Sequence, residues 1–200
     1  MGELIRRRGM VDKAEEETWD CVWDYTMGLP GNNGWTKTIS GGAANVTEAL
    51  TSTHLEISAK QGCYIRYDAP SAGSVSKGVM EAVFNTAQPV SGAQQLAGLC
   101  IGDGTYALFV AVTPDSRLRF WDKNLPSNST VVYNDIQNRV YYTIRLVLNE
   151  NVGEIYVDGT KVATVDTTKT YYKRASRFTA QSTSSAKAYW KSVKVRSESI

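Results

Sequence analysis

The chain has 200 residues, a formal net charge of +2, 42% hydrophobic residues and 21% charged residues. A charge this close to balance, with no basic stripe interleaved with aromatic residues, excludes a general electrostatic attraction to nucleic acid or to an anionic membrane. No apolar run approaches the ~20 residues that cross a bilayer as a helix, and none follows the arginines near Met1, so we expect synthesis in the cytoplasm without a signal peptide.

The first 18 residues differ in composition from the rest of the chain. Arginines at 6–8 precede glutamates at 15–17, and such a charged segment buries little apolar surface. We predict that residues 1–18 form a charged leader that is either flexible or docks on another protein. No linker rich in Pro, Gly or Ser divides the remainder, so residues 19–200 are predicted to form a single domain.

Short runs of alternating apolar and polar residues dominate the first part of this domain. This period of two is typical of a strand with one buried face. Glycine-rich stretches at 28–34 and 41–45 interrupt the runs and indicate loops. The predicted strands are 35–39, 54–59, 63–67, 78–85, 96–101, 106–112 and 117–121, followed by a polar loop at 123–129.

The clearest pattern lies nearer the C-terminus. Asp158-Gly159 joins two alternating segments, and this dipeptide suits a type I′ hairpin because both central residues must take positive φ. The strands predicted here are 140–148, 154–157, 161–165, 174–180 and 187–196. Many short strands with frequent turns, and no long stretch of helical period, predict an all-β fold of two antiparallel sheets packed as a β-sandwich.

Three cysteines, Cys21, Cys63 and Cys100, are scattered along the chain. They form no CxxC pair and have no histidine cluster nearby, which argues against a structural zinc site or a disulfide framework. We expect buried thiols that pack as small hydrophobic side chains.

The order of these segments resembles the concanavalin A-like lectin/glucanase superfamily, and its laminin-G-like members in particular. The resemblance covers most of residues 35–196, and its motifs are YIRY at 64–67, GVMEAVF at 78–84, YTIRL at 142–146, IYVDGTKVA at 155–163 and a closing strand with Trp190. It implies a jelly roll that binds or cleaves polysaccharide. The start of the chain, MGELIRRRGM followed by WDCVWDYTMGLP, is similar to small tail-associated proteins of phages and prophages.

The catalytic residues of the glucanase branch have no counterpart here. Retaining hydrolysis needs two carboxylates that point from one strand into the cleft, whereas Glu56 and Glu81 each stand alone, and Asp158, which flanks the same strand as Glu154, belongs to the turn. His54 is the single histidine, and no Gly-x-Ser-x-Gly motif is present. We therefore expect a non-enzymatic protein.

Sugar binding on a sheet requires aromatic rings that pack on the pyranose and polar groups that bind its hydroxyls. Trp121, which ends a predicted strand, is the first choice, although it could instead pack in the core as expected for Trp190. The remaining predicted ligand-binding residues are Tyr106, Tyr133, Asn124 and Asn134, with Tyr141, Tyr171, Tyr172 and Gln137 as further candidates.

A cofactor is not expected. Asp115, Asp122, Asn134 and Asp135 lie in predicted loops and carry oxygen ligands of the kind calcium prefers, but their spacing matches no EF-hand. Acidic loop residues that only face solvent account for them as well.

Together these observations predict a lectin-like, carbohydrate-binding module that contacts a bacterial surface glycan. The second resemblance implies that it belongs to a phage or prophage virion and contacts other tail proteins through its N-terminal segment. A purely structural virion module, which could be a homo-oligomer, and a divergent glycoside hydrolase or polysaccharide lyase are the alternatives.

Overall fold

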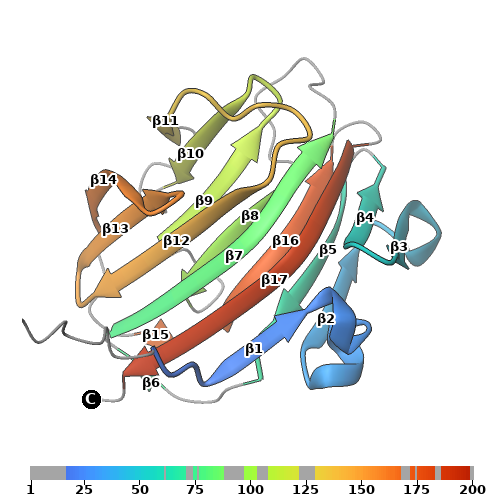
Figure 1. Ribbon diagram of the computed structural model, residues 1–200, viewed down its shortest axis with the longest axis horizontal. Coiled ribbons are helices and arrows are strands. Elements are labelled where there is room, and N and C mark those ends of the chain that lie inside the picture. The colour runs from blue at the N-terminus through green and yellow to red at the C-terminus, as the bar shows by residue number, and fades with distance from the viewer. Residues whose placement is uncertain are drawn as a thin grey trace, which may run out of the picture.

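Two antiparallel sheets face each other in the computed structural model and form a β-sandwich, which confirms the predicted fold class (Figure 1). The structure describes residues 17–60, 62–70, 74–75, 77–87, 97–102, 108–121, 129–167, 172–173, 175–182 and 186–198. Within these residues the strands make an eight-stranded sheet, a seven-stranded sheet and a small two-stranded one. No helix in the described part of the chain is long and apolar enough to span a bilayer.

The eight-stranded sheet runs in the order β14-β13-β12-β7-β17-β4-β3, and β1 also pairs with β17. Its strands are β1 (Cys21–Asp24), β3 (Val46–Leu50), β4 (Leu55–Ala59), β7 (Lys77–Ala87), β12 (Tyr142–Asn149), β13 (Val152–Val157), β14 (Thr160–Asp166) and β17 (Ala186–Glu198). The long strand β17 therefore has β7 along one edge, and β4 and then β1 along the other.

The seven-stranded sheet runs in the order β11-β10-β9-β8-β16-β5-β2. Its strands are β2 (Thr36–Ser40), β5 (Cys63–Asp68), β8 (Ala97–Gly102), β9 (Leu108–Thr113), β10 (Arg117–Trp121), β11 (Ser129–Tyr133) and β16 (Ala175–Ser182). The two-stranded sheet pairs β6 (Ser74–Val75) with β15 (Tyr172–Lys173).

An aromatic cluster fills the space between the two large sheets. The ring of Phe178 on β16 lies 4.8 Å from that of Trp190 on β17, 5.1 Å from that of Tyr67, 5.4 Å from that of Trp35 and 5.9 Å from that of Trp23. Phe178 and Trp190 are fully buried, as the sequence predicts for Trp190. Stacked and edge-on rings of this kind contribute beyond the area they bury, so this cluster ties the sheets together.

The predicted Asp158-Gly159 hairpin is confirmed. Asp158 has φ +47° and Gly159 has φ +79°, as a type I′ turn requires, and the turn joins β13 to β14. The Asp158 carboxylate also accepts a hydrogen bond of 2.8 Å from the backbone N–H of Thr143, which anchors the turn to β12.

Several short strands escaped the sequence analysis. Strands β1, β3 and β11 were not predicted, and the predicted loop at 123–129 overlaps β11 at Ser129. The loop predicted at 28–34 contains a 3₁₀ turn at Pro30–Asn33, and another at Ala43–Asn45 occupies the predicted break. Each missed strand pairs with only one other strand; β1 is only four residues long, and β3 and β11 bury one residue and none, so the hydrophobic pattern is short or weak.

The three cysteines are buried thiols, as predicted. Cys63 donates a hydrogen bond of 3.4 Å from Sγ to the carbonyl of Gly41. Burial raises the pKa of the Cys21 thiol to about 11, so it stays protonated at neutral pH.

Truncation of the central ring tests the aromatic cluster. Phe178→Ala should lower the free energy of unfolding by about 3–5 kcal/mol, because a buried ring leaves a cavity that its neighbours cannot fill. Leu50→Ala is the control, since Leu50 is 41% exposed and its loss should cost less than about 0.5 kcal/mol. Urea unfolding measures both, and equal effects would contradict a sandwich centred on Phe178.

Candidate functional site

A row of polar side chains crosses the outer face of the eight-stranded sheet. Lys194 on β17 lies opposite Glu81 on β7, Glu81 lies opposite Arg145 on β12, and Arg145 lies opposite Tyr156 on β13. Residues beside each of them along the strands, such as Ile144 and Ile155, are buried in the core. Alternation along four adjacent strands therefore directs this row away from the core.

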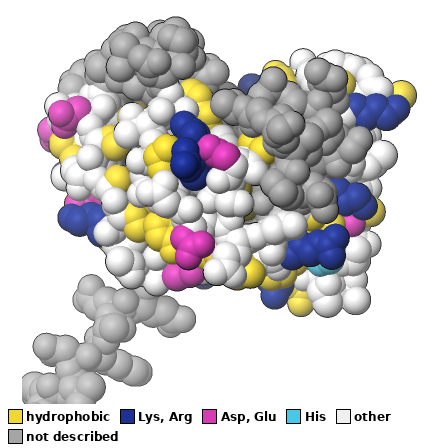
Figure 2. Space-filling model, turned by 90° about the horizontal axis from the view of Figure 1, so that it is seen from above, with side chains coloured by type: hydrophobic (Ala, Val, Ile, Leu, Met, Phe, Trp, Pro, Cys, Tyr) yellow, Lys and Arg dark blue, Asp and Glu magenta, His cyan; other side chains and the backbone are white. Residues whose placement is uncertain are grey.

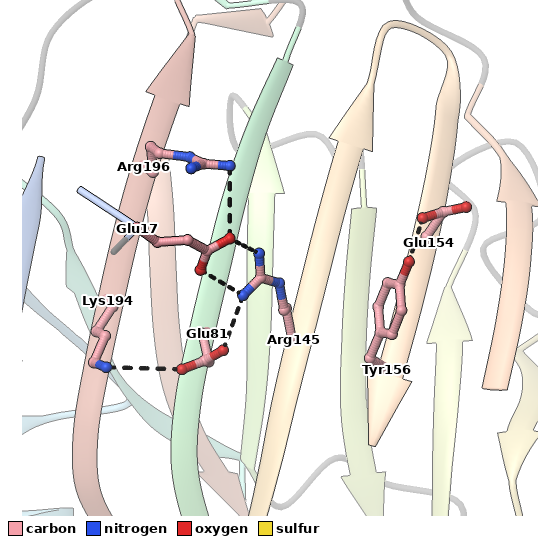
Figure 3. Close-up of polar contacts among 7 residues, drawn as sticks. All are labelled: Glu17, Glu81, Arg145, Glu154, Tyr156, Lys194 and Arg196. Carbon is pink, nitrogen blue, oxygen red and sulfur yellow. Dashed lines mark hydrogen bonds and ion pairs between the residues drawn. The ribbon is translucent and has the colours of Figure 1, made fainter. Parts of the chain in front are cut away.

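Arg145 is the centre of an ion-pair network on this face (Figure 3). Its guanidinium donates to both carboxylate oxygens of Glu17, at 2.8 and 2.5 Å, and to Glu81 at 3.3 Å. Lys194 approaches Glu81 at 3.9 Å, and Arg196 approaches Glu17 at 3.9 Å. The bidentate contact between Arg145 and Glu17 is the geometry in which a guanidinium binds a carboxylate most strongly.

The segment that carries Glu17 is fixed by pairing with the last strand. Strand β1 pairs Cys21 with Val195, and the backbone N–H of Asp20 donates to the carbonyl of Val195 at 2.9 Å. Trp19 lies over two cations of the network, with Arg145 Cζ 5.7 Å and Lys194 Nζ 5.6 Å from its ring centroid. Glu17 thus lies on the sheet of its own chain, while residues 1–16 of the predicted leader are outside the described residues.

The ion pair between Glu17 and Arg145 shifts the pKa of both groups. The hydrogen bond from Arg145 lowers the pKa of the Glu17 carboxyl from its ordinary value of 4.5, against the opposing effect of burial. The same bond raises the pKa of Arg145, and Glu81 adds to this effect. Both groups are therefore charged throughout the neutral range.

A hollow of about 640 Å³ opens beside this network on the same face. It is lined by Glu81, Thr143, Arg145, Val147, Glu154, Tyr156, Asp158 and Gly159. The Tyr156 hydroxyl donates to Glu154 at 2.5 Å, which raises the pKa of Tyr156, and Glu154 also accepts a hydrogen bond of 3.0 Å from Lys161. The hollow offers an aromatic ring, a guanidinium and carboxylates within reach of one ligand.

This site was not predicted from the sequence. Glu81, Glu154 and Asp158 were considered there only as carboxylates without a catalytic partner. The strands YTIRL and GEIYVDG carry a usable signal, because their outward positions hold Arg145 and Tyr156 on neighbouring strands of one meander. No pattern in the sequence connects Arg145 to Glu17, 128 residues earlier.

The residue favoured from the sequence, Trp121, lies on the other large sheet. It is half-buried at the end of β10, and its ring is 5.5 Å from that of Phe109, its partner on β9. Phe109, Cys100 and Ala111 form a second buried cluster, separate from the main core, against which Trp121 packs. Because Val110 and Leu108 of the same strand face the core, this cluster is on the outer face of the seven-stranded sheet.

The other predicted binding residues do not gather around Trp121. Tyr133 lies opposite Leu118 and packs against the main core, so it faces away from the side that carries Trp121. Asn134 is exposed in the turn that follows β11. Tyr106 and Asn124 lie outside the described residues.

The further candidates are also dispersed. Lys191 Nζ lies 4.2 Å from the ring centroid of Tyr141, so the lysine covers one face of that ring. Gln137 is exposed. Tyr171 lies outside the described residues, as does the side chain of Tyr172.

Metal ligands are not assembled within the described ranges. No group of three or more His, Cys, Asp or Glu side chains that could hold an ion occurs there. Asp115 is engaged by Arg119 at 2.7 Å and by Arg117 at 3.4 Å, while Asp122 lies outside these ranges.

The groups considered for catalysis have structural roles where they are described. His54 Nδ1 is 2.9 Å from the hydroxyl of Thr53, and its ring packs edge-on against Tyr189, which confirms the interpretation of a hydrogen-bonded histidine. Each described strand carries at most one acidic residue, so none presents two carboxylates on one face. Glu81 is held between Arg145 and Lys194.

The described surface is mixed in charge where the molecule is seen from above. Figure 2 shows the described surface from above, where Lys and Arg side chains form several separate groups and Asp and Glu side chains lie between or beside them. Hydrophobic side chains form small patches among these groups. This distribution agrees with a net charge of only +2.

The arrangement of the sheets is that of the concanavalin A-like jelly roll, and solved structures share it. A sialidase superposes with a TM-score of 0.66 at 14% identity over 88% of this chain. The carbohydrate-binding module CBM66 from Bacillus subtilis gives 0.55 at 15% identity, covering 82% of this chain and 96% of its own. The β-glucanase of Bacillus licheniformis gives 0.60 at 13% identity, covering 84% and 94%.

These likenesses define the fold of the protein. This chain spans only 18% of the sialidase. No protein-family model and no curated protein matches the sequence. Binding modules and enzymes both occur among the solved structures, so the function rests on the site.

A double-mutant cycle tests the ion pair at the centre of the site. Glu17→Gln and Arg145→Gln should show a coupling of about 0.5–1 kcal/mol at pH 7. Because folding lowers the pKa of Glu17, this stabilisation is present above pH 4.5 and is lost as the pH falls through the lower folded pKa. Urea unfolding at pH 7 and at the lowest pH where the protein still folds measures both values.

The exposed pair between Lys187 and Glu56, 2.6 Å apart on the same sheet, provides the comparison cycle. A coupling between Glu17 and Arg145 that is unchanged in acid would show that the contact is not ionic.

Proposed function

We propose that this protein is a non-catalytic, lectin-like carbohydrate-binding module whose ligand occupies the hollow between β7, β12 and β13. One observation carries the proposal: the ring of Tyr156 lies in that hollow beside the guanidinium of Arg145 and the carboxylates of Glu81 and Asp158. An aromatic ring with charged hydrogen-bonding groups around it is the combination that a pyranose requires.

The chemistry of the lining supports this assignment. The apolar face of a sugar ring packs on an aromatic face, and its hydroxyls donate to carboxylates and accept from a guanidinium. Arg145 and Glu81 are already oriented by their mutual contact, and Asp158 is held by its bond from Thr143. A ligand therefore meets preoriented groups and orders few of them on binding.

The comparisons support the same class of function at the level of the fold. CBM66 is a carbohydrate-binding module by name. This chain matches it over nearly the whole length of CBM66. The β-glucanase shows that the fold also supports cleavage of a glucan. The absence of a strand with two acidic residues among the described residues favours binding over hydrolysis.

The proposal also covers the source of the ligand and the particle to which the module is attached. A glycan of the bacterial surface as ligand, and attachment to a phage or prophage virion through the N-terminal segment, are supported by the resemblance of the first residues of the chain to tail-associated proteins. Trp121, half-buried at the end of β10, is the alternative aromatic contact for such a glycan.

Glycan-array binding followed by calorimetric titration tests the function and the site. Tyr156→Ala should weaken binding of the best array ligand about tenfold or more, equivalent to ~1.4 kcal/mol or more, because the packing surface is removed. Tyr189→Ala is the matched control, since Tyr189 is a half-buried tyrosine that faces outward from the same sheet, beside His54.

Binding to no array glycan would overturn the function. If Trp121→Ala abolishes binding and Tyr156→Ala leaves it intact, the module binds sugar through the seven-stranded sheet and the assignment of the site is wrong. Release of reducing ends from a bound polysaccharide, lost in Glu81→Gln, would replace the proposal with a hydrolase.

A further inference from the structure

The network around Arg145 contains a carboxylate that does not belong to the sheet. Glu17 reaches Arg145 from the segment before β1 and forms the bidentate contact that a free carboxylate would form. Glu81, the other acid on Arg145, lies in the middle of β7 with strands paired on both sides. Withdrawing Glu17 from Arg145 therefore requires less rearrangement of the sheet than withdrawing Glu81.

We propose that Arg145, Arg196 and Lys194 form a carboxylate-binding subsite at the edge of the hollow, that Glu17 is its internal occupant, and that an acidic saccharide containing hexuronate units displaces Glu17. This inference rests on the proposed function and names the class of sugar that the same site selects.

Charge is the first argument. With Glu17 in place, two carboxylates face three cations, whereas with Glu17 withdrawn Glu81 alone faces them. Withdrawal of Glu17 therefore raises the excess of cations over acids in the network from one to two, which favours the binding of another anion. A planar guanidinium flanked by a second guanidinium and an ammonium binds a carboxylate in a defined orientation.

Accessibility is the second argument. The Glu17 side chain is 39% exposed, against 20% for Glu81, so Glu17 is the outermost acid of the network. Asp20 is already hydrogen-bonded to Val195, so Thr18 and Trp19 separate Glu17 from the paired part of the chain. Glu17 can therefore leave Arg145 while β1 remains paired with β17, whereas Glu81 cannot leave without disrupting β7.

Continuity with the hollow is the third argument. Arg145 belongs to the subsite and also lines the hollow, and its register partner on β13 is Tyr156. A uronate bound on Arg145 would therefore lie next to the hollow that Tyr156 lines. A neutral sugar has no carboxylate to replace Glu17, so it contacts Arg145 only through its hydroxyls and leaves Glu17 in place.

Calorimetric titration of the full chain with α-1,4-linked tri-galacturonate and with the neutral α-1,4-linked galactose trisaccharide tests the inference. We expect the acidic trisaccharide to bind about tenfold tighter at low salt and to lose this advantage as salt is added, because ion pairs are screened. Both trisaccharides should depend on Tyr156.

Two variants separate the roles of the charged residues. Glu17→Gln should tighten tri-galacturonate binding about two- to fivefold and leave the neutral trisaccharide unchanged, since it removes a competitor held by an exposed ion pair. Arg145→Gln should abolish the preference for the acidic sugar. Glu56→Gln, which removes the partner of Lys187 on the same sheet, is the control and should change neither affinity.

The outcomes distinguish this inference from the proposed function. Equal affinity for the two trisaccharides, or an unchanged or weaker affinity for tri-galacturonate in Glu17→Gln, would overturn the carboxylate subsite and leave the carbohydrate-binding function standing. If the acidic and neutral trisaccharides and every array glycan fail to bind, the proposed function falls and the inference falls with it.

Discussion

The pairing of β7 with β17 is the interaction on which the rest of the structure depends. It joins the first half of the chain to its C-terminal strand over the whole length of β7, and β17 then carries β4 and β1 on its other edge. The ring of Phe84 on β7 stacks on that of Trp190 on β17, with 4.4 Å between centroids. One ladder therefore fixes both the middle of a sheet and part of the aromatic core.

The same ladder sets the register of the candidate site. It places Lys194 opposite Glu81, and the next pairing places Glu81 opposite Arg145. A slip of one residue would turn Glu81 into the core and an apolar residue such as Met80 or Ala82 to the surface. The burial of Met80 and Ala82 thus holds the charged row on the outside, and packing in the core determines electrostatics on the surface.

The sequence predicted the fold better than it predicted the site. The meander from β12 to β14 was recognisable because the side chains of β12 and β13 alternate strictly between core and surface and because Asp158-Gly159, which demands one turn type, leads into β14. Strand β3 was missed since only Val46 of its five residues is buried, which leaves little hydrophobic pattern to read. Local pattern reveals strands with several buried positions, such as β4 and β5, and misses a short strand such as β1 or one that buries little, such as β3.

The site was missed for a different physical reason. Its central contact joins residues 128 positions apart, and only the tertiary structure brings them together. Aromatic residues at strand ends were a reasonable guide to a sugar platform, but Tyr133 and Trp121 face opposite sides of one sheet. Which side a residue near a strand end takes depends on register, and β10 and β11 shift register between Leu118 and Arg119.

The short segment between Glu17 and β1 keeps an internal carboxylate close to Arg145, and an external acid must compete with it. A carboxylate that is attached to the chain a few residues from its binding partner is present there at an effective concentration in the millimolar range. Dilute single acids compete poorly with it, whereas a polymer that presents the same group repeatedly matches its local density. The attachment of Glu17 to the sheet would in this way weaken the binding of a single acid about two- to fivefold, a loss that a polymer offsets because it presents the group repeatedly.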